Sequence, residues 1–249
     1  SVSATPDSLI TSIINPYKVG IDSVMNEVLC VSNIEMTKGK PESLLGNFVT
    51  DLCLKMYDTI ADICIMNNGG LRSTLPYGQI TRGDIYKLMP FDNELVIVEL
   101  NLSDIFELSE FIISRGGEPF SGFTIYYFDV DSTIGFDCNK GHLVECSFFH
   151  KNKSDSVVVE GNYCGDGTGK ISFDDKRQFY TFRVLTSDYL ANGGGGMLFF
   201  KDKKQTKVGI RLRDAIINYC KENKTITSNL SPSRNGRLIY RNYPYMYYE

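Results

Sequence analysis

A short apolar segment that runs directly into a glycine-rich turn is the feature that most constrains this chain. Residues 62–72 read D-I-C-I-M-N-N-G-G-L-R, so a strand over 62–66 is followed by the turn N-N-G-G at 67–70 and then by Arg72. Glycines let the backbone adopt positive φ and approach a ligand closely, and an arginine can bind a phosphate in a bidentate manner. The segment therefore predicts an anion site. A tight strand-to-helix turn with an exposed arginine is the alternative that this segment alone leaves open.

Two later segments accompany this turn. L-M-P-F-D-N at 88–93 leads into an alternating strand over 94–100, and D-Y-L-A-N at 188–192 runs into four glycines at 193–196. In this order and at these separations, N-x-G-G-[IL]-R, L-x-P-F-x-N and D-[YF]-L-A-N-G-G-x-G resemble motifs of the C-terminal, substrate-binding domain of the 5′-nucleotidases. That family includes ecto-5′-nucleotidase and bacterial UDP-sugar hydrolase. The resemblance extends over roughly residues 28–222.

The resemblance implies roles for individual residues. Asn67 and Arg72 match an amide and an arginine that contact the substrate, with Arg72 directed at phosphate. Phe91 and Tyr189 match two aromatic residues that sandwich the base, and Asn93 matches an asparagine that hydrogen-bonds the base edge in bacterial members. Stacking on an aromatic ring tolerates any base and contributes roughly 1 to 3 kcal/mol per ring. Taken singly, either ring has core packing as its alternative role. The complete set of expected substrate-binding residues is Asn67, Gly69, Gly70, Arg72, Phe91, Asn93, Tyr189, Asn192 and Gly195.

Two positions depart from the family pattern. The family's G-G-D-G, whose aspartate accepts from ribose hydroxyls, is replaced by four glycines, so Gly195 cannot supply that carboxylate. The family also places an arginine just before E-x-x-x-G-N, which occurs here at 42–47, but Pro41 occupies that position with Lys38 and Lys40 nearby. A lysine supplies a point charge without bidentate geometry. We therefore expect weak affinity, or a ligand other than an ordinary nucleoside monophosphate.

The family's catalytic chemistry requires residues that this chain lacks. Hydrolysis of a phosphate ester in the 5′-nucleotidases depends on two metal ions held by several His, Asp and Asn ligands. The chain has two histidines, His142 and His150, both expected in loops or at strand ends, and no D-x-H, G-N-H-[DE] or G-H-x-H motif. We therefore expect no catalytic residue, metal site or cofactor in this chain. The resemblance implies that divalent metal ions are bound by a separate metallophosphoesterase domain.

The glycine-rich stretch at 161–170 is not a P-loop. The pattern G-x-x-x-x-G-K-[ST] would need glycine at position 164, where Cys164 stands, and Ser or Thr after Lys170, where Ile171 stands. We expect a polar hairpin loop here.

Composition bounds the class of protein and its partners. With 249 residues, 42% hydrophobic and 22% charged, the chain is typical of a globular protein that buries a sizeable core. A formal net charge of −4 and the absence of a clustered basic segment argue against a nucleic-acid partner.

No apolar run approaches the ~18 residues of a membrane span and no signal-peptide pattern is found, so we expect a soluble chain in a mature or trimmed form. The family resemblance implies an extracytoplasmic location: periplasmic, secreted or surface-anchored.

The seven cysteines form no C-x-x-C pair, which argues against a structural zinc site. Cys53 and Cys64 lie in an apolar helix and an apolar strand, where a buried thiol acts as a small hydrophobe. Cys138 and Cys146 flank an expected hairpin loop and could form a disulfide in an oxidising compartment.

Helical and strand patterns alternate without a regular βαβ repeat, which favours an α+β fold with largely antiparallel pairing. The resemblance implies two packed sheets flanked by helices. We divide the chain into an N-terminal helical extension, 1–27, with a kink or break at Pro16 and a helix that resumes near Ile21, and one substrate-binding domain, 28–249. The further elements expected are strands at 28–36, 62–66, 94–100, 122–130, 143–149, 157–159, 179–185 and 238–240, and helices at 43–57, 81–88, 102–113 and 209–222.

The sequence is compatible with three functions. The first is the substrate-specificity part of a 5′-nucleotidase-like phosphohydrolase whose catalytic domain is supplied elsewhere. The second is a freestanding nucleotide- or nucleoside-binding protein, and the third is a domain retained for protein contacts. The tyrosine-rich end at 243–249 is either a docking surface for a metallophosphoesterase chain or a tail folded onto its own domain.

Overall fold

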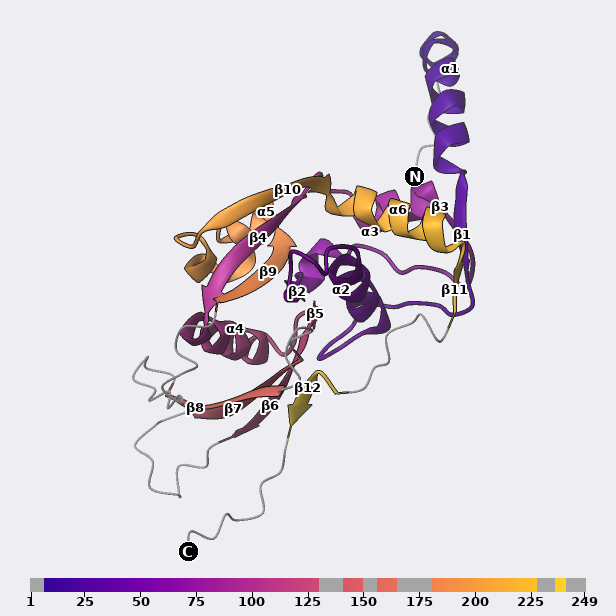
Figure 1. Ribbon diagram of the computed structural model, residues 1–249. Helices are drawn as coiled ribbons and strands as arrows, with labels where there is room; N and C mark the ends of the chain where they lie inside the picture. The colour runs from indigo at the N-terminus through magenta and orange to yellow at the C-terminus, as the bar shows by residue number, and fades with distance from the viewer. Residues whose placement is uncertain (1–6, 130–140, 150–155, 165–180, 228–235, 241–249) are drawn as a thin grey trace, which may run out of the picture.

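Helices and strands alternate through the computed structural model, which describes residues 7–129, 141–149, 156–164, 181–227 and 236–240 (Figure 1). The α-helices are α1 (Ser8–Met25), α2 (Leu44–Met56), α3 (Arg82–Leu88), α4 (Leu102–Ser114), α5 (Asp188–Ala191) and α6 (Leu212–Asn223). Short 3₁₀ helices are η1 (Asn68–Gly70), η3 (Gly194–Gly196) and η4 (Leu198–Phe200). The strands are β1 (Val28–Ser32), β2 (Ile63–Ile65), β3 (Gly78–Thr81), β4 (Glu94–Asn101), β5 (Phe120–Ser121), β6 (Phe123–Asp129), β7 (Gly141–Phe149), β8 (Ser156–Cys164), β9 (Thr181–Ser187), β10 (Gln205–Arg211), β11 (Thr225–Ile226) and β12 (Leu238–Tyr240).

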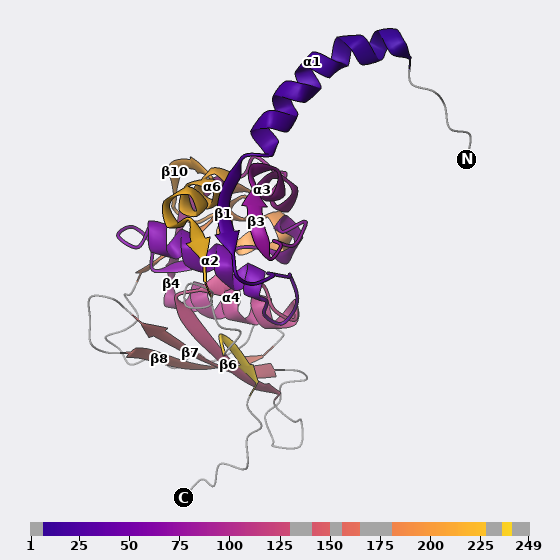
Figure 2. The ribbon, with the colours of Figure 1, turned by 90° about the vertical axis from the view of Figure 1, so that its right-hand side faces the viewer.

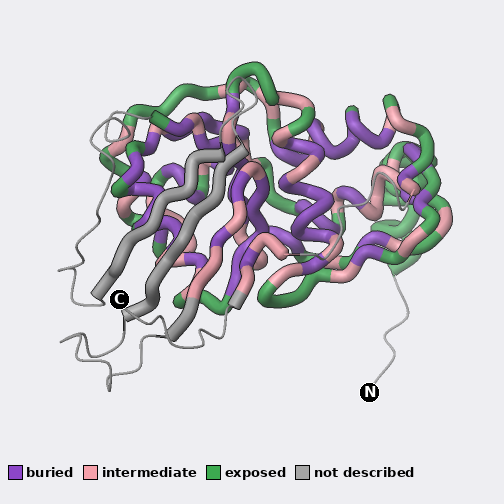
Figure 3. Tube along the Cα trace, turned by 60° about the horizontal axis from the view of Figure 1, so that its bottom comes forward, coloured by how far each residue is buried: buried purple, intermediate pink, exposed green. Residues whose placement is uncertain are grey.

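A five-stranded sheet with the order β10-β4-β9-β2-β5 forms the centre of the fold. Side chains alternate between the two faces of a strand, and here both faces are buried. Val96, Val98 and Val184 pack with α4 on one face, whereas Leu95 and Leu185 pack with α2 and α6 on the other. This explains why β4 is apolar at consecutive positions. Buried residues accordingly run along the strands and helices of the body, with exposed residues on its outer turns (Figure 3).

Two further sheets flank this centre, a four-stranded one with the order β12-β6-β7-β8 and a three-stranded one with the order β11-β1-β3. Helix α4 contacts both β4 and β7, so it lies between the two larger sheets (Figures 1 and 2). Among the described strands, the parallel pairs are β1–β11, β2–β9 and β6–β12, and the other pairs are antiparallel. The expected mixed α/β class, with largely antiparallel sheets flanked by helices, is confirmed, and the three-stranded sheet is an addition to the expected pair.

Two helices begin at side chains that cap them. Thr81 and Asp84 form a capping box at the start of α3, and Asn101 and Asp104 form a second one at α4. In each box the two side chains accept hydrogen bonds from each other's backbone N–H, which satisfies donors that a helix start leaves free. Both starts agree with the helices predicted from the sequence.

Helix α1 differs from its prediction. It is continuous, so the break expected at Pro16 is wrong, whereas the kink expected as its alternative agrees with a helix that bends along its length (Figure 2). Pro16 removes a single N–H donor, and the remaining backbone hydrogen bonds of the helix are enough to keep the residues on both sides of Pro16 helical. Asp7 caps the first turn by accepting from the Leu9 and Ile10 N–H groups. None of its residues is buried, and the helix stands away from the body (Figures 1 and 2).

Three other predicted boundaries are wrong. The strand expected at 157–159 extends over 156–164 as β8, so residues 161–164 of the expected hairpin loop belong to a strand. The strand expected at 28–36 ends at Ser32, whose hydroxyl donates to the Ile34 carbonyl at 2.7 Å and turns the chain. The helix expected at 209–222 begins at Leu212, because the preceding residues belong to the edge strand β10. Strands β3, β5, β10 and β11 were not predicted, since β10 is largely exposed and β5 and β11 are only two residues long.

Cys53 and Cys64 are buried free thiols, as expected. Burial raises the pKa of the Cys64 thiol well above its usual value, which keeps the group neutral in the core.

The strand expected at 238–240 is confirmed as β12. The proposed disulfide partner Cys138, the residues 165–170 of the glycine-rich stretch and the tail at 243–249 lie outside the described residues.

Candidate functional site

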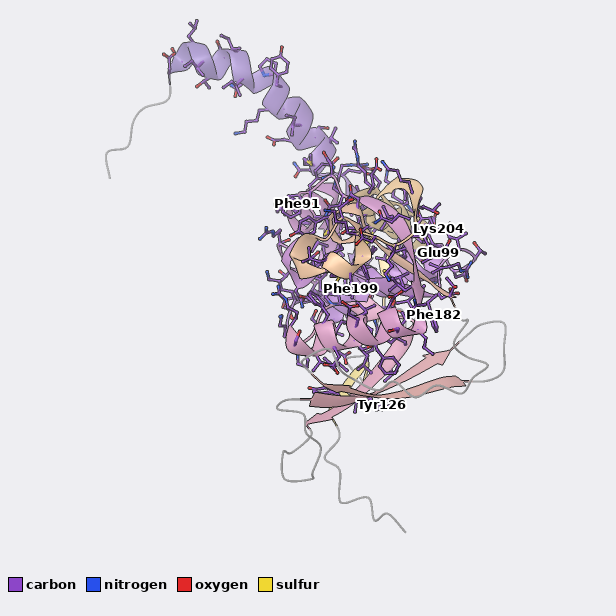
Figure 4. The ribbon with its side chains drawn as sticks, turned by 90° about the vertical axis from the view of Figure 1, so that its left-hand side faces the viewer. Phe91, Glu99, Tyr126, Phe182, Phe199 and Lys204 are labelled. Atoms are coloured by element: carbon purple, nitrogen blue, oxygen red, sulfur yellow. The ribbon has the colours of Figure 1, made fainter. Side chains whose placement is uncertain are left out.

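Strand directions bring the three sequence motifs to one end of the central sheet. β9 pairs in parallel with β2 and antiparallel with β4. The carboxyl ends of β2 and β9 therefore meet the amino end of β4. The turn that follows β2, the segment that precedes β4 and the glycines that follow β9 all leave the sheet at this end. Phe91 accordingly lies well apart from Glu99 and Phe182, which mark the opposite end of β4 and β9 (Figure 4).

Glycines are required in the turn after β2 for space. The Asn67 amide lies against Gly69 and Gly70, and a Cβ added to Gly70 would lie 2.9 Å from Asn67 Oδ1. The Gly70 N–H donates to the Asn67 carbonyl at 2.9 Å. Neither glycine has positive φ, so the expectation that they adopt left-handed geometry is wrong. Their role is to leave room for the Asn67 side chain.

A buried carboxylate that the sequence reading missed fixes the same turn. Glu118 accepts from the Asn68 N–H at 2.6 Å, and the Asn68 amide donates to the Gly117 carbonyl at 3.1 Å. Arg115 lies 3.8 Å from the Glu118 carboxylate and partly balances its charge. Asn68 Oδ1 is buried without a hydrogen-bond partner. In the sequence, Gly116 and Gly117 indicate only that α4 ends before Glu118. No local pattern therefore predicts the contact between Glu118 and Asn68.

Arg72 lies against Phe91. Its guanidinium carbon is 5.1 Å from the centroid of the Phe91 ring, within the range of a cation–π contact. The Arg72 N–H donates to the Leu88 carbonyl at 2.9 Å, which ties the turn after β2 to the segment that carries Phe91. Both side chains are exposed. Among the ion pairs formed by the described residues, none includes Arg72, so its charge is free to meet an anion.

Two lysines, Lys38 and Lys40, lie close to position 41, where the family pattern has an arginine. Lys38 donates to the Leu71 carbonyl at 3.3 Å, beside Arg72. Lys40 donates to the Arg115 carbonyl. Glu42 accepts from the Arg237 and Leu238 N–H groups, each at 2.8 Å, and thereby holds the start of β12. Of the two lysines, Lys38 is therefore the one placed to add positive charge at the turn.

Tyr189 packs on the glycine run that follows α5. Its hydroxyl accepts from the Gly195 N–H at 2.9 Å, and a Cβ added to Gly194 would lie 2.6 Å from its ring atoms. Gly193, Gly195 and Gly196 have positive φ, which disfavours side chains at these positions. Tyr189 is still 48% exposed, because the glycines cover only part of its ring.

The two remaining asparagines have different surroundings. The Asn192 amide donates to the Asp188 carbonyl at 2.8 Å, so it closes the end of α5. The Asn93 carbonyl accepts from the Leu212 N–H at 2.9 Å, and its side chain is half-buried. Close to Asn93, the buried Arg213 contacts Met89 and Asp92, which lie on either side of Phe91. The sequence reading missed Arg213, because a charge in the first turn of an amphipathic helix is usually solvated.

The described residues contain no group of three or more His, Cys, Asp and Glu side chains that could hold a metal ion. His142 lies in β7, and His150 lies outside the described ranges. The site at the sheet end thus offers a cation, two aromatic rings and amides, which suit the binding of an anionic aromatic ligand.

Residues 23–202 match the family model of the 5′-nucleotidase C-terminal domain. The chain belongs to this family. All three motifs that carry the resemblance fall within the matched region.

Known relatives of this 5′-nucleotidase C-terminal domain are longer than the chain. A cell wall protein of Listeria monocytogenes is 27% identical over 96% of this chain and 30% of its own length. The 5′-nucleotidase of Homo sapiens is 22% identical over 79% of this chain and 34% of its own length. The crystal structure of a 5′-nucleotidase precursor from Thermus thermophilus shares the fold with a TM-score of 0.64 and 21% identity, over 97% of this chain and 45% of that one. The chain therefore spans less than half of each of these proteins.

Proposed function

We propose that this domain binds a nucleotide and provides the substrate specificity of a 5′-nucleotidase-like phosphohydrolase. Arg72 would bind a phosphate, supported by Asn67 in the adjoining turn. Phe91 and Tyr189 would stack on the base, and Asn93 would contact its edge. The observation that carries the proposal is the convergence of these motifs at one end of the central sheet, with Arg72 against Phe91 at 5.1 Å.

Exposure and charge support this assignment. Phe91 is 40% exposed and Tyr189 is 48% exposed, although a ring used only for core packing would be buried. Arg72 covers part of Phe91, so a base would stack on the remaining ring surface. Each stacked ring contributes roughly 1 to 3 kcal/mol to binding in known base-stacking sites.

The catalytic step would be supplied by a metal-dependent domain outside this chain. The described residues offer no cluster of metal ligands, so the divalent ions that the family implies do not fit here. We expect the purified chain to lack phosphatase activity even with added divalent metal. A metal-dependent rate that persists through repurification would contradict this.

Helix α1 supports the existence of such a neighbour. Its large apolar side chains are 52% to 73% exposed, namely Leu9, Ile10, Ile13, Ile14, Tyr17, Val19, Ile21 and Val24. An exposed apolar surface of this kind usually marks a contact site. We assign residues 1–27 to an extension outside the binding domain, 28–249, and propose that this extension contacts the catalytic part.

An extracytoplasmic location accompanies this function. Relatives include a cell wall protein and a 5′-nucleotidase precursor. Within the described residues, no helix combines the length and the apolar character that crossing a bilayer requires.

Calorimetric titration of the full chain with AMP, UMP, adenosine and a UDP-sugar tests the proposal. We expect AMP to bind more tightly than adenosine, and Arg72→Gln to abolish that difference. Lys207→Gln, which removes an exposed charge on β10, should leave it unchanged. Tight binding by the chain alone would favour a freestanding nucleotide- or nucleoside-binding protein. No binding by the chain, either alone or with a metallophosphoesterase, would leave a domain retained for protein contacts.

A further inference from the structure

Arg213 is a buried arginine in the first turn of α6 that reaches the segment carrying Phe91. Its side chain is only about 7% exposed. Nη1 donates to the Met89 carbonyl at 3.2 Å, and Nη2 forms an ion pair with the Asp92 carboxylate. The guanidinium carbon also lies 4.1 Å from the centroid of the Tyr86 ring. One side chain thus binds two residues that flank Phe91 and stacks on a third.

The neighbouring backbone adds a third attachment. The Leu212 N–H donates to the Asn93 carbonyl at 2.9 Å. The start of α6 therefore contacts this segment before Phe91 at Met89 and after it at Asp92 and Asn93. Since Phe91 is 40% exposed, packing alone does not determine the position of its ring. The hydrogen bonds to its flanking residues constrain the backbone that carries the ring.

Stability alone does not account for an arginine at this place. A buried charge costs free energy unless every donor finds a partner, and Arg213 Nε has none. Its partner Asp92 is 65% exposed, which weakens the ion pair by solvent screening. A planar guanidinium can bind two acceptors while stacking on a ring, whereas a lysine cannot do so. The geometry therefore suits positioning better than it suits stabilisation.

We propose that Arg213 is a positioning residue that holds the 89–93 segment so that the Phe91 ring faces the ligand. This inference rests on the proposed function, in which Phe91 stacks on a base. Arg213 acts through the Met89 carbonyl and the Asp92 carboxylate and does not itself contact the ligand.

Hydrogen exchange of the full chain tests the positioning without any ligand. Arg213→Lys keeps the charge but loses the planar fork, so amide exchange in a peptide spanning 88–93 should become faster. The matched control is Arg211→Lys, because Arg211 is exposed and lies 4.0 Å from Asp92. Should Arg213→Lys fold poorly, Asp92→Asn removes the carboxylate from an exposed position and should also accelerate exchange. Unchanged exchange in these variants would overturn the proposal.

Binding of adenosine and of ribose 5-phosphate separates positioning from general structural damage. Arg213→Lys should weaken adenosine binding by about threefold to tenfold, the low range of couplings between contacting residues. Binding of ribose 5-phosphate, which has no base to stack, should stay unchanged. In a Phe91→Ala background the Arg213→Lys loss should disappear, because its effect passes through the ring. Equal losses for both ligands, or a full loss in the Phe91→Ala background, would overturn the proposal.

The two proposals fail in different ways. If Phe91→Ala leaves adenosine binding unchanged, the base-stacking role fails, and the exchange data alone decide whether Arg213 orders the segment. If Phe91→Ala weakens binding while Arg213→Lys changes neither exchange nor affinity, only the role of Arg213 is wrong.

Discussion

The hydroxyl of Tyr189 accepts a hydrogen bond from the backbone N–H of Gly195 at 2.9 Å. Gly195 stands where the family's G-G-D-G motif has an aspartate that accepts from ribose hydroxyls. In this chain the same loop position is therefore tied to an aromatic residue of the proposed site. The carboxylate of the family motif is missing, but the loop that would carry it is held beside the ring.

Restoring the carboxylate should restore ribose recognition. Gly195 has φ 65° and ψ 2°, a left-handed conformation that aspartate tolerates better than most residues. Gly195→Asp should increase affinity for ribonucleosides over 2′,3′-dideoxy analogues by about 1 to 3 kcal/mol, measured by calorimetry. Gly194→Asp is the control, because a Cβ there would meet the Tyr189 ring at 2.6 Å and should destabilise the loop. Unchanged discrimination in Gly195→Asp would mean that the loop does not face the sugar.

Removal of either aromatic ring should impair binding more than folding. Phe91 and Tyr189 are 40% and 48% exposed, so their truncation creates no large cavity. Phe91→Ala and Tyr189→Ala should each weaken nucleoside binding by roughly 1 to 3 kcal/mol. Phe106→Ala is the comparison for a buried ring and should cost ~3 to 5 kcal/mol of unfolding free energy. A comparable loss of stability in Phe91→Ala or Tyr189→Ala, measured by urea denaturation, would assign that ring to the core.

Glu110 on α4 should make the fold less stable as pH rises. Burial raises the pKa of its carboxyl to about 7, and Oε1 has no hydrogen-bond partner. The folded state therefore holds a proton that the unfolded state releases at lower pH, so stability falls from about pH 4.5 to pH 7. Glu110→Gln should be nearly neutral at pH 4 and stabilising by about 1 to 2 kcal/mol at pH 8, after a discount for partial exposure.

Urea denaturation at both pH values measures this effect. Glu35→Gln, which changes an exposed carboxylate, serves as the control. An equal effect of Glu110→Gln at the two pH values would show that its carboxyl has an ordinary pKa.

Arg237 should stabilise the attachment of β12. Its guanidinium donates to the Phe120 carbonyl and pairs with Asp51, each at 2.6 Å. Burial raises the pKa of Asp51, and Arg237 opposes that rise. Arg237→Ala would leave both acceptors unpaired and should cost about 2 to 3 kcal/mol, less than a fully buried pair because Asp51 is 40% exposed.

Thermal unfolding measures this cost. Loss of Arg237 should lower Tm by several degrees, at about 2 to 4 °C per kcal/mol for a chain of this size. Lys204→Ala, which removes an exposed partner of Glu99, should change Tm little. A similarly small shift in Arg237→Ala would show that β12 is held without this cluster.

The sequence by itself determined the elements whose signals are local. The capping boxes at Thr81 and Asn101 start α3 and α4 where the pattern places them, and the closing strand at 238–240 is present as β12. The motifs also identified the family, because their residues recur in a fixed order. Local signals failed at Pro16, where the helix continues without a break, and at β10, whose residues from Gly209 onward were predicted to belong to the following helix.

Tertiary structure decided which of these elements meet. Pairing of β9 with both β2 and β4 joins strands that are far apart in the sequence, and it alone brings Arg72, Phe91 and Tyr189 to one end of the sheet. Glu118 and Arg213 contact the site only because the chain folds back on itself, and a charged residue in a turn or in the first turn of a helix reads as solvated from sequence alone. Hydrophobic periodicity reports which face of an element is buried, but the partner of that face depends on long-range pairing that no local pattern records.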